Sequence, residues 1–220
     1  MYSQLRMRLS IIVTVLLFLG SLKTVQGQYY YQETNKIGIK VGALVSRLNP
    51  TNSSGGQERV RNSVSIGAYA TFPLKRKFHI HADVSYSLRG GKISNPAAVQ
   101  DTFQRNINFR LNYIEATGLV CYAAEPLYIG IGPSLGYLFR AKGKGLEGAD
   151  TTGTDWQVSK SNFRWYDIGL SGEIGFKSDT YVFGLRGTYG ILGISTSSKA
   201  QALLPGARNI NGQLFIVAYF

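Results

Sequence analysis

Apolar and polar side chains alternate along most of this chain with a period of two residues. Residues 77–89 (KFHIHADVSYSLR) show the pattern most clearly, with one apolar face and one polar face. A β-strand sends successive side chains to opposite faces, so this stretch reads as a strand that separates two environments. The same pattern recurs in seven further segments, 36–47, 63–73, 107–123, 127–140, 163–177, 180–194 and 209–220. Helical periodicity is poor, and the sequence therefore predicts eight strands.

The connections between these segments alternate in length. Three are short, near 74–76, 124–126 and 178–179, and four are long, at about 48–62, 90–106, 141–161 and 195–208. With an even number of strands, all long loops fall at one end. Short turns at one end and long loops at the other are typical of outer-membrane barrels. We therefore expect an all-β fold, an eight-stranded antiparallel up-and-down transmembrane β-barrel with short periplasmic turns and long external loops.

Alternation alone does not say which face meets water. A secreted soluble lipocalin-like barrel, which would bind an apolar ligand, points its apolar face inward, and a membrane barrel does the reverse. The polar faces here are rich in Gly and Ser and carry single charges of both signs, which suits the narrow lumen of eight strands. We favour the membrane barrel and expect a luminal polar network of Lys40, Asp83, Arg89, Glu115, Asp167, Glu173, Lys177 and Arg186.

Residues 107–123 fit the pattern least well. Ile107, Phe109, Leu111 and Tyr113 share a face that Glu115 continues. A carboxylate among lipid-facing residues would be costly. We therefore expect a β-bulge near residues 112–114 that turns Glu115 to the polar side.

The first 27 residues have the layout of a secretory signal peptide. Arg6 and Arg8 precede an apolar run from Leu9 to Leu19, and small residues precede the expected cleavage after Gly27. The mature barrel domain would span 28–220. Three of the 24 Lys and Arg residues lie in the signal, which leaves 21 basic against 12 acidic residues and a net charge of +9. This balance favours anionic partners, and secretion argues against nucleic acid. Cys121 is the single cysteine, so no internal disulfide can form.

Basic residues gather near the long loops. Outer-membrane lipid and lipopolysaccharide phosphates are the expected partners of Arg47, Arg59, Arg61, Arg105, Arg110, Lys142, Lys144, Lys160 and Arg164. Phe220, an aromatic residue at the end of the last predicted strand, resembles the signal read by the bacterial barrel-assembly machinery, which is a second expected partner. These features place the protein in the outer membrane of a Gram-negative bacterium.

Several stretches resemble the PorT-like outer-membrane β-barrel family of Bacteroidota. They include KIGIKVGALVSRL, LYIGIGPSLGYLFRAKGKG and RNINGQLFIVAYF, and the resemblance covers nearly all of the mature chain. Its most specific parts are the Asn-Tyr-x-Glu stretch at 112–115, Gly-x-Gly-Pro at 130–133 and Arg-x-x-Tyr-Gly at 186–190. Thr117 departs from the family, which often has Pro at this position. The resemblance implies an outer-membrane barrel, and the secretion role of the founding member is not transferred.

Few residues suggest chemistry. The stretch 132–136 matches the G-x-S-x-G nucleophile pattern but lies within a predicted strand, with no helix following it. His79 and His81 share a strand face with Asp83, but no third metal ligand is evident. A lipid-modifying enzyme that uses Ser134, His81 and Asp83 is a less favoured alternative. We expect no catalytic residue, cofactor or metal, and a structural or binding role through the external loops in envelope assembly, adhesion or lipopolysaccharide contact.

Overall fold

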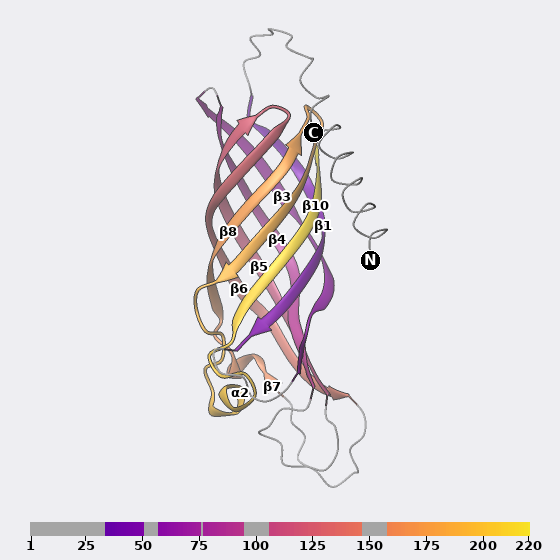
Figure 1. The fold of residues 1–220 in the computed structure, drawn as a ribbon, viewed down its shortest axis with the longest axis vertical. Helices are drawn as coiled ribbons and strands as arrows, with labels where there is room; N and C mark the ends of the chain where they lie inside the picture. The colour runs from indigo at the N-terminus through magenta and orange to yellow at the C-terminus, as the bar shows by residue number, and fades with distance from the viewer. Residues whose placement is uncertain (1–33, 51–56, 76, 95–105, 147–157) are drawn as a thin grey trace, which may run out of the picture. The chain divides into compact units, whose positions relative to one another are not determined.

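The computed structural model describes residues 34–50, 57–75, 77–94, 106–146 and 158–220. Eight long strands form one closed sheet (Figure 1). They are β1 Lys36–Asn49, β3 Arg61–Lys75, β4 Phe78–Ser94, β5 Asn106–Ala124, β6 Leu127–Leu146, β8 Tyr166–Lys177, β9 Tyr181–Gly190 and β10 Arg208–Tyr219. Each long strand pairs antiparallel with the next, and β10 pairs back onto β1 from Gly38↔Tyr219 to Asn49↔Arg208. The eight-stranded up-and-down barrel predicted from the alternation is confirmed.

Short elements extend the barrel at the end that carries the long loops. β2 (Gln57–Arg59) pairs with β4, and β7 (Val158–Ser159) pairs with β6. A 3₁₀ turn, η2 (Lys160–Asn162), follows β7, and α2 (Ser198–Leu203) lies between β9 and β10. Figure 1 shows α2 and β7 at the end of the barrel away from the C-terminus. No helix among the described residues is long and apolar enough to cross a membrane.

The outer wall of the barrel is apolar. A central band of exposed aliphatic side chains runs around it and includes Ile39, Ile66, Val84, Ile131, Ile168, Leu185 and Ile216. Charged residues of the same strands, such as Asp83, Asp167 and Arg186, are buried inside. The apolar face thus points outward, and the soluble lipocalin-like alternative is wrong, because that fold requires the opposite orientation.

Aromatic side chains border the aliphatic band at both ends. Near the short turns the exposed rings include Phe72, Phe78, Tyr122, Phe176, Tyr181 and Phe183, and near the long loops they include Tyr86, Tyr137, Phe139, Trp165 and Tyr189. Rings at these two heights match the aromatic girdles that sit at the lipid–water interfaces of membrane barrels. The distribution defines which part of the wall lies in hydrocarbon.

Two hydrophobic clusters fill the ends of the interior. At the short-turn end, Tyr69, Leu119, Cys121, Tyr128, Val182, Phe215 and Val217 pack together. At the long-loop end, the strand residues Leu48, Phe109, Leu111, Tyr113 and Leu138 pack against Phe163, Ile194, Ala200, Leu204 and Ala207. Ile194, Ala200, Leu204 and Ala207 belong to the segment 191–207 between β9 and β10, which we call the cap. Its backbone is tied to the neighbouring segment by Arg164 N–H donating to the Ile194 carbonyl at 2.7 Å.

The irregularity expected near residues 112–114 exists, but on the neighbouring strand. The β5–β6 register shifts between Asn112↔Arg140 and Tyr113↔Leu138, so Phe139 of β6 is the extra residue. The alternation of β5 continues unbroken, and Phe109, Leu111, Tyr113 and Glu115 all point inward. The prediction that the apolar residues of this segment face away from Glu115 is wrong for Phe109, Leu111 and Tyr113, because the hydrophobic cluster under the cap accepts them inside the barrel. The side chain of Ile107 lies outside the described part of the chain.

Candidate functional site

A network of charged side chains crosses the middle of the barrel interior. Arg186 on β9 lies 2.6 Å from Asp83 on β4 (Nη1 to Oδ2) and 2.5 Å from Glu173 on β8 (Nη2 to Oε2). Lys40 on β1 donates from Nζ to Asp83 Oδ1 at 2.6 Å. In the closed order of strands β4 and β9 lie opposite each other, so the Arg186–Asp83 pair spans the lumen.

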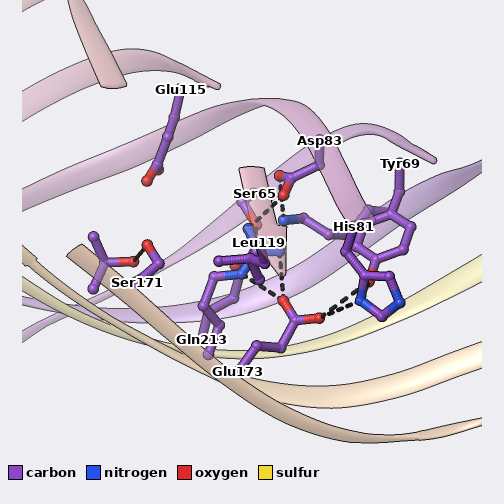
Figure 2. Close-up of polar contacts among 12 residues, drawn as sticks. Ser65, Tyr69, His81, Asp83, Glu115, Leu119, Ser171, Glu173 and Gln213 are labelled. Carbon is purple, nitrogen blue, oxygen red and sulfur yellow. Dashed lines mark hydrogen bonds and ion pairs between the residues drawn. The ribbon is translucent and has the colours of Figure 1, made fainter. Parts of the chain in front are cut away.

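Glu173 is the hub of this network. Its Oε1 accepts from the hydroxyls of Tyr128 at 2.7 Å and Tyr69 at 3.0 Å, and His81 Nδ1 lies 3.3 Å away. Figure 2 shows Glu173 with Tyr69 and His81 on one side and the contacts toward Asp83 on the other. We call Lys40, Asp83, Glu173 and Arg186, with Tyr69, His81 and Tyr128, the Glu173 cluster.

A second group lies closer to the cap. Arg89 on β4 pairs with Glu115 on β5, and its Nη1 is 3.5 Å from Asp167 Oδ2 on β8. Asn209 on β10 donates to the same Asp167 oxygen at 2.7 Å and to the Tyr113 hydroxyl at 3.3 Å. We call these five residues the Arg89 cluster. It joins the ionic layer to the hydrophobic cluster under the cap through Tyr113.

Hydroxyl and amide side chains complete the polar interior. Ser171 and Thr188 oxygens are 2.8 Å apart, and Gln213 donates to Ser65. Lys177, expected in the luminal network, is half-buried near the short-turn end, with its Nζ 3.3 Å from His79 Nε2. The other seven residues of the expected network lie inside the barrel in the two clusters.

The interior charges are nearly balanced. The buried cations are Lys40, Arg89 and Arg186, and the buried carboxylates are Asp83, Glu115, Asp167 and Glu173. Each of these seven groups has an oppositely charged partner, as burial in a low-dielectric site requires. Tyr69, Tyr128 and Asn209, which the alternation alone did not single out, supply the remaining hydrogen bonds. The sequence sign of their role is that all three fall on the polar faces of their segments, since Tyr128 lies between Leu127 and Ile129 and Asn209 precedes Ile210.

The residues suggested for lipid modification or metal binding have other contacts inside the barrel. His81 Nδ1 lies 2.6 Å from the Tyr69 hydroxyl, and Asp83 is bound by Lys40 and Arg186. Within the described ranges Ser134 forms no side-chain hydrogen bond with His81 or Asp83, so the suggested Ser134–His81–Asp83 arrangement is not formed there. The same part of the chain contains no group of three His, Cys, Asp or Glu side chains placed to hold a metal ion.

The outer rim at the long-loop end is cationic. Of the residues expected there, Arg47, Arg59, Arg110 and Lys142 are exposed, and Arg61, Lys160 and Arg164 are partly exposed. Arg105 and the side chain of Lys144 lie outside the described part of the chain, as does the proposed signal peptide. The structure adds Lys92, Arg140 and Arg208 to this rim, since all three reach the surface at the same end. A regular alternation along 127–140 predicts Arg140 on the polar inner face with Ser134, and the structure corrects this prediction by turning Arg140 outward.

Three of the rim cations rest on tyrosine rings. Lys160 Nζ is 4.9 Å from the ring centre of Tyr137, and the Arg164 guanidinium is 5.3 Å from that of Tyr166. The Arg208 guanidinium is 6.0 Å from the ring centre of Tyr189 and donates to its hydroxyl at 3.0 Å. Such contacts hold long side chains at the aromatic girdle.

Phe220 lies at the other end of the barrel, at the seam. Its side chain is 87% exposed, and its backbone N–H donates to the Ile37 carbonyl at 3.1 Å. The ring is therefore presented to the surroundings where β10 closes against β1.

Comparison with known proteins identifies the family of this barrel. A family model described as "Outer membrane protein beta-barrel domain" matches residues 27–195. No curated protein matches the sequence.

Among solved structures, the chain is similar to three small outer-membrane proteins. Neisserial surface protein A (NspA) is 15% identical, with 86% of this chain and 100% of that one covered and a TM-score of 0.47. Ail, the attachment invasion locus protein of Yersinia pestis, solved with the heparin analogue sucrose octasulfate, is 13% identical, with 86% and 100% covered and a TM-score of 0.45. OprG from Pseudomonas aeruginosa is 13% identical, with 84% and 93% covered and a TM-score of 0.34. These values are too low to transfer a function.

Proposed function

Since the chain belongs to the outer membrane protein beta-barrel domain family, we propose that this small outer-membrane barrel has a binding role at the cell surface, carried by its cationic outer rim. The partner class that suits the rim is the phosphorylated lipopolysaccharide of the outer leaflet. Adhesion and envelope assembly remain compatible with the same surface, because both use the external end of the barrel.

The interior supports a binding role over transport. Hydrophobic side chains fill both ends of the lumen, and the Glu173 and Arg89 clusters fill the middle. A solute would have to displace paired charges and the cap to pass. Eight strands enclose an interior that side chains can fill, which leaves the outer surface as the working part of the molecule.

The distribution of charge is the observation that carries the proposal. The described carboxylate side chains lie inside the barrel or near the short turns, as Glu125 and Asp179 do. At the long-loop rim the described charged side chains are cations: Arg47, Arg59, Arg61, Lys92, Arg110, Arg140, Lys142, Lys160, Arg164 and Arg208. Cations gathered at the described rim attract anionic head groups, with an attraction that salt screens.

The chemistry of a lipid-modifying enzyme has weaker support. His81 and Asp83 are engaged in the Glu173 cluster, and within the described residues Ser134 is not hydrogen-bonded to either of them. We infer that the protein acts by binding and not by catalysis.

Titration with lipopolysaccharide tests the proposal. The folded protein in detergent micelles is heated with and without lipopolysaccharide, and unfolding is followed by the change in gel mobility that folded barrels show on boiling. We expect lipopolysaccharide to raise the unfolding temperature at 50 mM salt and to have much less effect at 500 mM salt. An unfolding temperature that does not change at low salt would refute the proposed role.

A further inference from the structure

The bulge in β6 determines which side chains face outward in the part of the strand nearest the long loops. Just before the bulge, Tyr137 points outward and Leu138 inward. Phe139 and Arg140 are both exposed, Ala141 is buried again, and Lys142 is exposed. One extra residue in a strand reverses the facing of everything beyond it. The bulge therefore directs Arg140 and Lys142 to the outer wall. Without it, the alternation of residues 127–138 would continue and turn both side chains inward.

The neighbouring strand places a third cation beside them. Arg110 of β5 lies directly opposite Lys142 in the register, and Asn112 lies opposite Arg140. Directly opposite residues have Cβ atoms about 5 Å apart, so the three charged side chains form one patch. The partner of Arg110 on its other side is Gly90 of β4, which has no side chain to crowd it.

Gly90 is required at this position by the backbone itself. Its φ is 140°, and a Cβ atom there would lie 2.0 Å from the Phe109 carbonyl oxygen. The close approach of β4 to the Phe109 backbone therefore requires glycine opposite Arg110, and Arg61 Nη1 donates to the same Phe109 carbonyl at 3.1 Å.

The three side chains of the patch are all positive, and no described acidic side chain pairs with them. Like charges directly opposite on neighbouring strands destabilise a sheet. Within the described ranges, neither Arg110, Arg140 nor Lys142 has an ion-pair partner, and none rests on a ring as Lys160, Arg164 and Arg208 do. Lys92 of β4, opposite Asn108 and Arg59, extends the same positive surface. An anion bound between the strands would remove the repulsion.

The height of the patch indicates where that anion comes from. Tyr137 and Phe139, exposed at 45% and 59%, belong to the aromatic girdle that marks the lipid–water interface. Arg140 and Lys142 follow within a few residues on the same strand, at the level of head groups. Arg side chains bind phosphate through paired N–H groups, and Lys adds a point charge.

We propose that Arg110, Arg140 and Lys142 form a binding site for a phosphate group of an outer-leaflet glycolipid, assembled by the β6 bulge. This site rests on the proposed function and makes it specific, since it names three residues of the rim and one chemical group. The acyl chains of the glycolipid would lie along the apolar wall below.

The test compares phosphorylated and dephosphorylated lipid A as probes. The full-length folded barrel is reconstituted in phosphatidylcholine nanodiscs, and the affinity for each probe is measured by titration at low salt. We expect the wild-type protein to prefer the phosphorylated probe and Arg110→Gln/Lys142→Gln to bind it at least ten-fold more weakly. Lys75→Gln/Lys77→Gln is the matched control, because it removes two exposed cations at the short-turn end, and its affinity should stay within two-fold of wild type. Inorganic phosphate at equal concentration should not compete.

Each outcome decides a separate question. If the wild type prefers phosphorylated lipid A but the double variant binds it equally well, this site is wrong and the proposed rim function stands. If the wild type does not distinguish the two probes, both proposals fail. Competition by inorganic phosphate at equal concentration would overturn the assignment to a glycolipid. If the double variant does not show the gel mobility of a folded barrel, the single variant Arg140→Gln is measured instead. A loss of three-fold or more in its affinity for phosphorylated lipid A would support the site, and an unchanged affinity would reject it.

Discussion

At the scale of single residues, each buried charge inside the barrel depends on its partners. Glu173 is contacted by Arg186, Tyr69, Tyr128 and His81, from four different strands. These donors offset the desolvation cost of the buried carboxylate, and removal of one member leaves the others unpaired.

Substitution of Glu173 by Gln is expected to lower the free energy of unfolding by about 3 kcal/mol, because Arg186 would then keep a single buried carboxylate partner. Urea unfolding in lipid vesicles measures this change. Glu125→Gln is the control, since Glu125 is exposed in the β5–β6 turn and its replacement should have almost no effect. Equal stabilities of the two variants would show that the Glu173 cluster does not hold the barrel together.

At the scale of elements, the cap packs on the barrel mouth without taking part in the pairing of the eight long strands. The cap buries Ile194, Ala200, Leu204 and Ala207 against the barrel mouth, and Ser197 caps the start of α2 by accepting from Ala200 N–H. The strand ladders below do not depend on these contacts. Loss of cap packing should therefore be felt locally.

Leu204→Ala removes a fully buried side chain from the cap and should cost about 2–5 kcal/mol of local packing. Proteolysis within residues 191–207 should become at least ten-fold faster, while the folded gel mobility of the barrel persists. The surface change Gln201→Ala serves as control, because Gln201 is exposed in the same helix. Global unfolding in Leu204→Ala would mean that the cap is not a separable unit.

The turn between β8 and β9 carries an ion pair that is sensitive to pH. Lys36 Nζ lies 2.9 Å from Asp179 Oδ1, and this hydrogen bond and the lysine charge lower the pKa of the Asp179 carboxyl. A lowered folded-state pKa means that the pair stabilises the protein above the usual carboxyl pKa and is lost as the pH falls through the lowered value. Because the Asp179 side chain is 86% exposed, solvent screening limits the effect to less than about 1 kcal/mol.

Asp179→Asn should therefore be slightly less stable than wild type at pH 7, and the difference should be smaller at about pH 2.5, because the pair loses its stabilising effect as the pH falls below the unfolded-state pKa of about 3.9 toward the lowered folded-state pKa. Urea unfolding of both proteins at the two pH values checks this, and 0.5 M salt at pH 7 should also reduce the difference. A difference that increases on acidification would contradict the assignment.

At the scale of the whole molecule, closure of the barrel joins the first and last strands. Phe220 donates its N–H to the Ile37 carbonyl at this seam and presents its ring outward. The idea that the barrel-assembly machinery reads this residue stays a prediction. It is separate from stability, because the exposed ring contributes little packing.

Phe220→Ala is expected to reduce the amount of folded protein in the outer membrane several-fold in cells, with little change in the unfolding free energy of the purified protein. Membrane fractionation and urea unfolding measure the two quantities. Phe72→Ala, which removes another exposed ring near the short turns, should leave the cellular amount nearly unchanged. Equal losses for both variants would argue against a special role for Phe220.

The sequence by itself determined the number of strands, their antiparallel order and the two faces of most of them. Successive side chains of a strand point to opposite faces. In a small membrane barrel the apolar face meets lipid, and the face with small and oppositely charged residues fills the lumen. This local rule was sufficient to place Lys40, Asp83, Glu173 and Arg186 inside the barrel.

Only the tertiary structure decided the facing of side chains near the long loops and the partners within the lumen. Phe109, Leu111 and Tyr113 point inward because the cap supplies an apolar surface there, and nothing local to their strand encodes it. The bulge at Phe139 turns Arg140 outward because the register of two strands must match across the sheet. Pairs such as Asp83–Arg186 form because closure brings opposite walls together, and alternation along one strand carries no information about the strand that faces it.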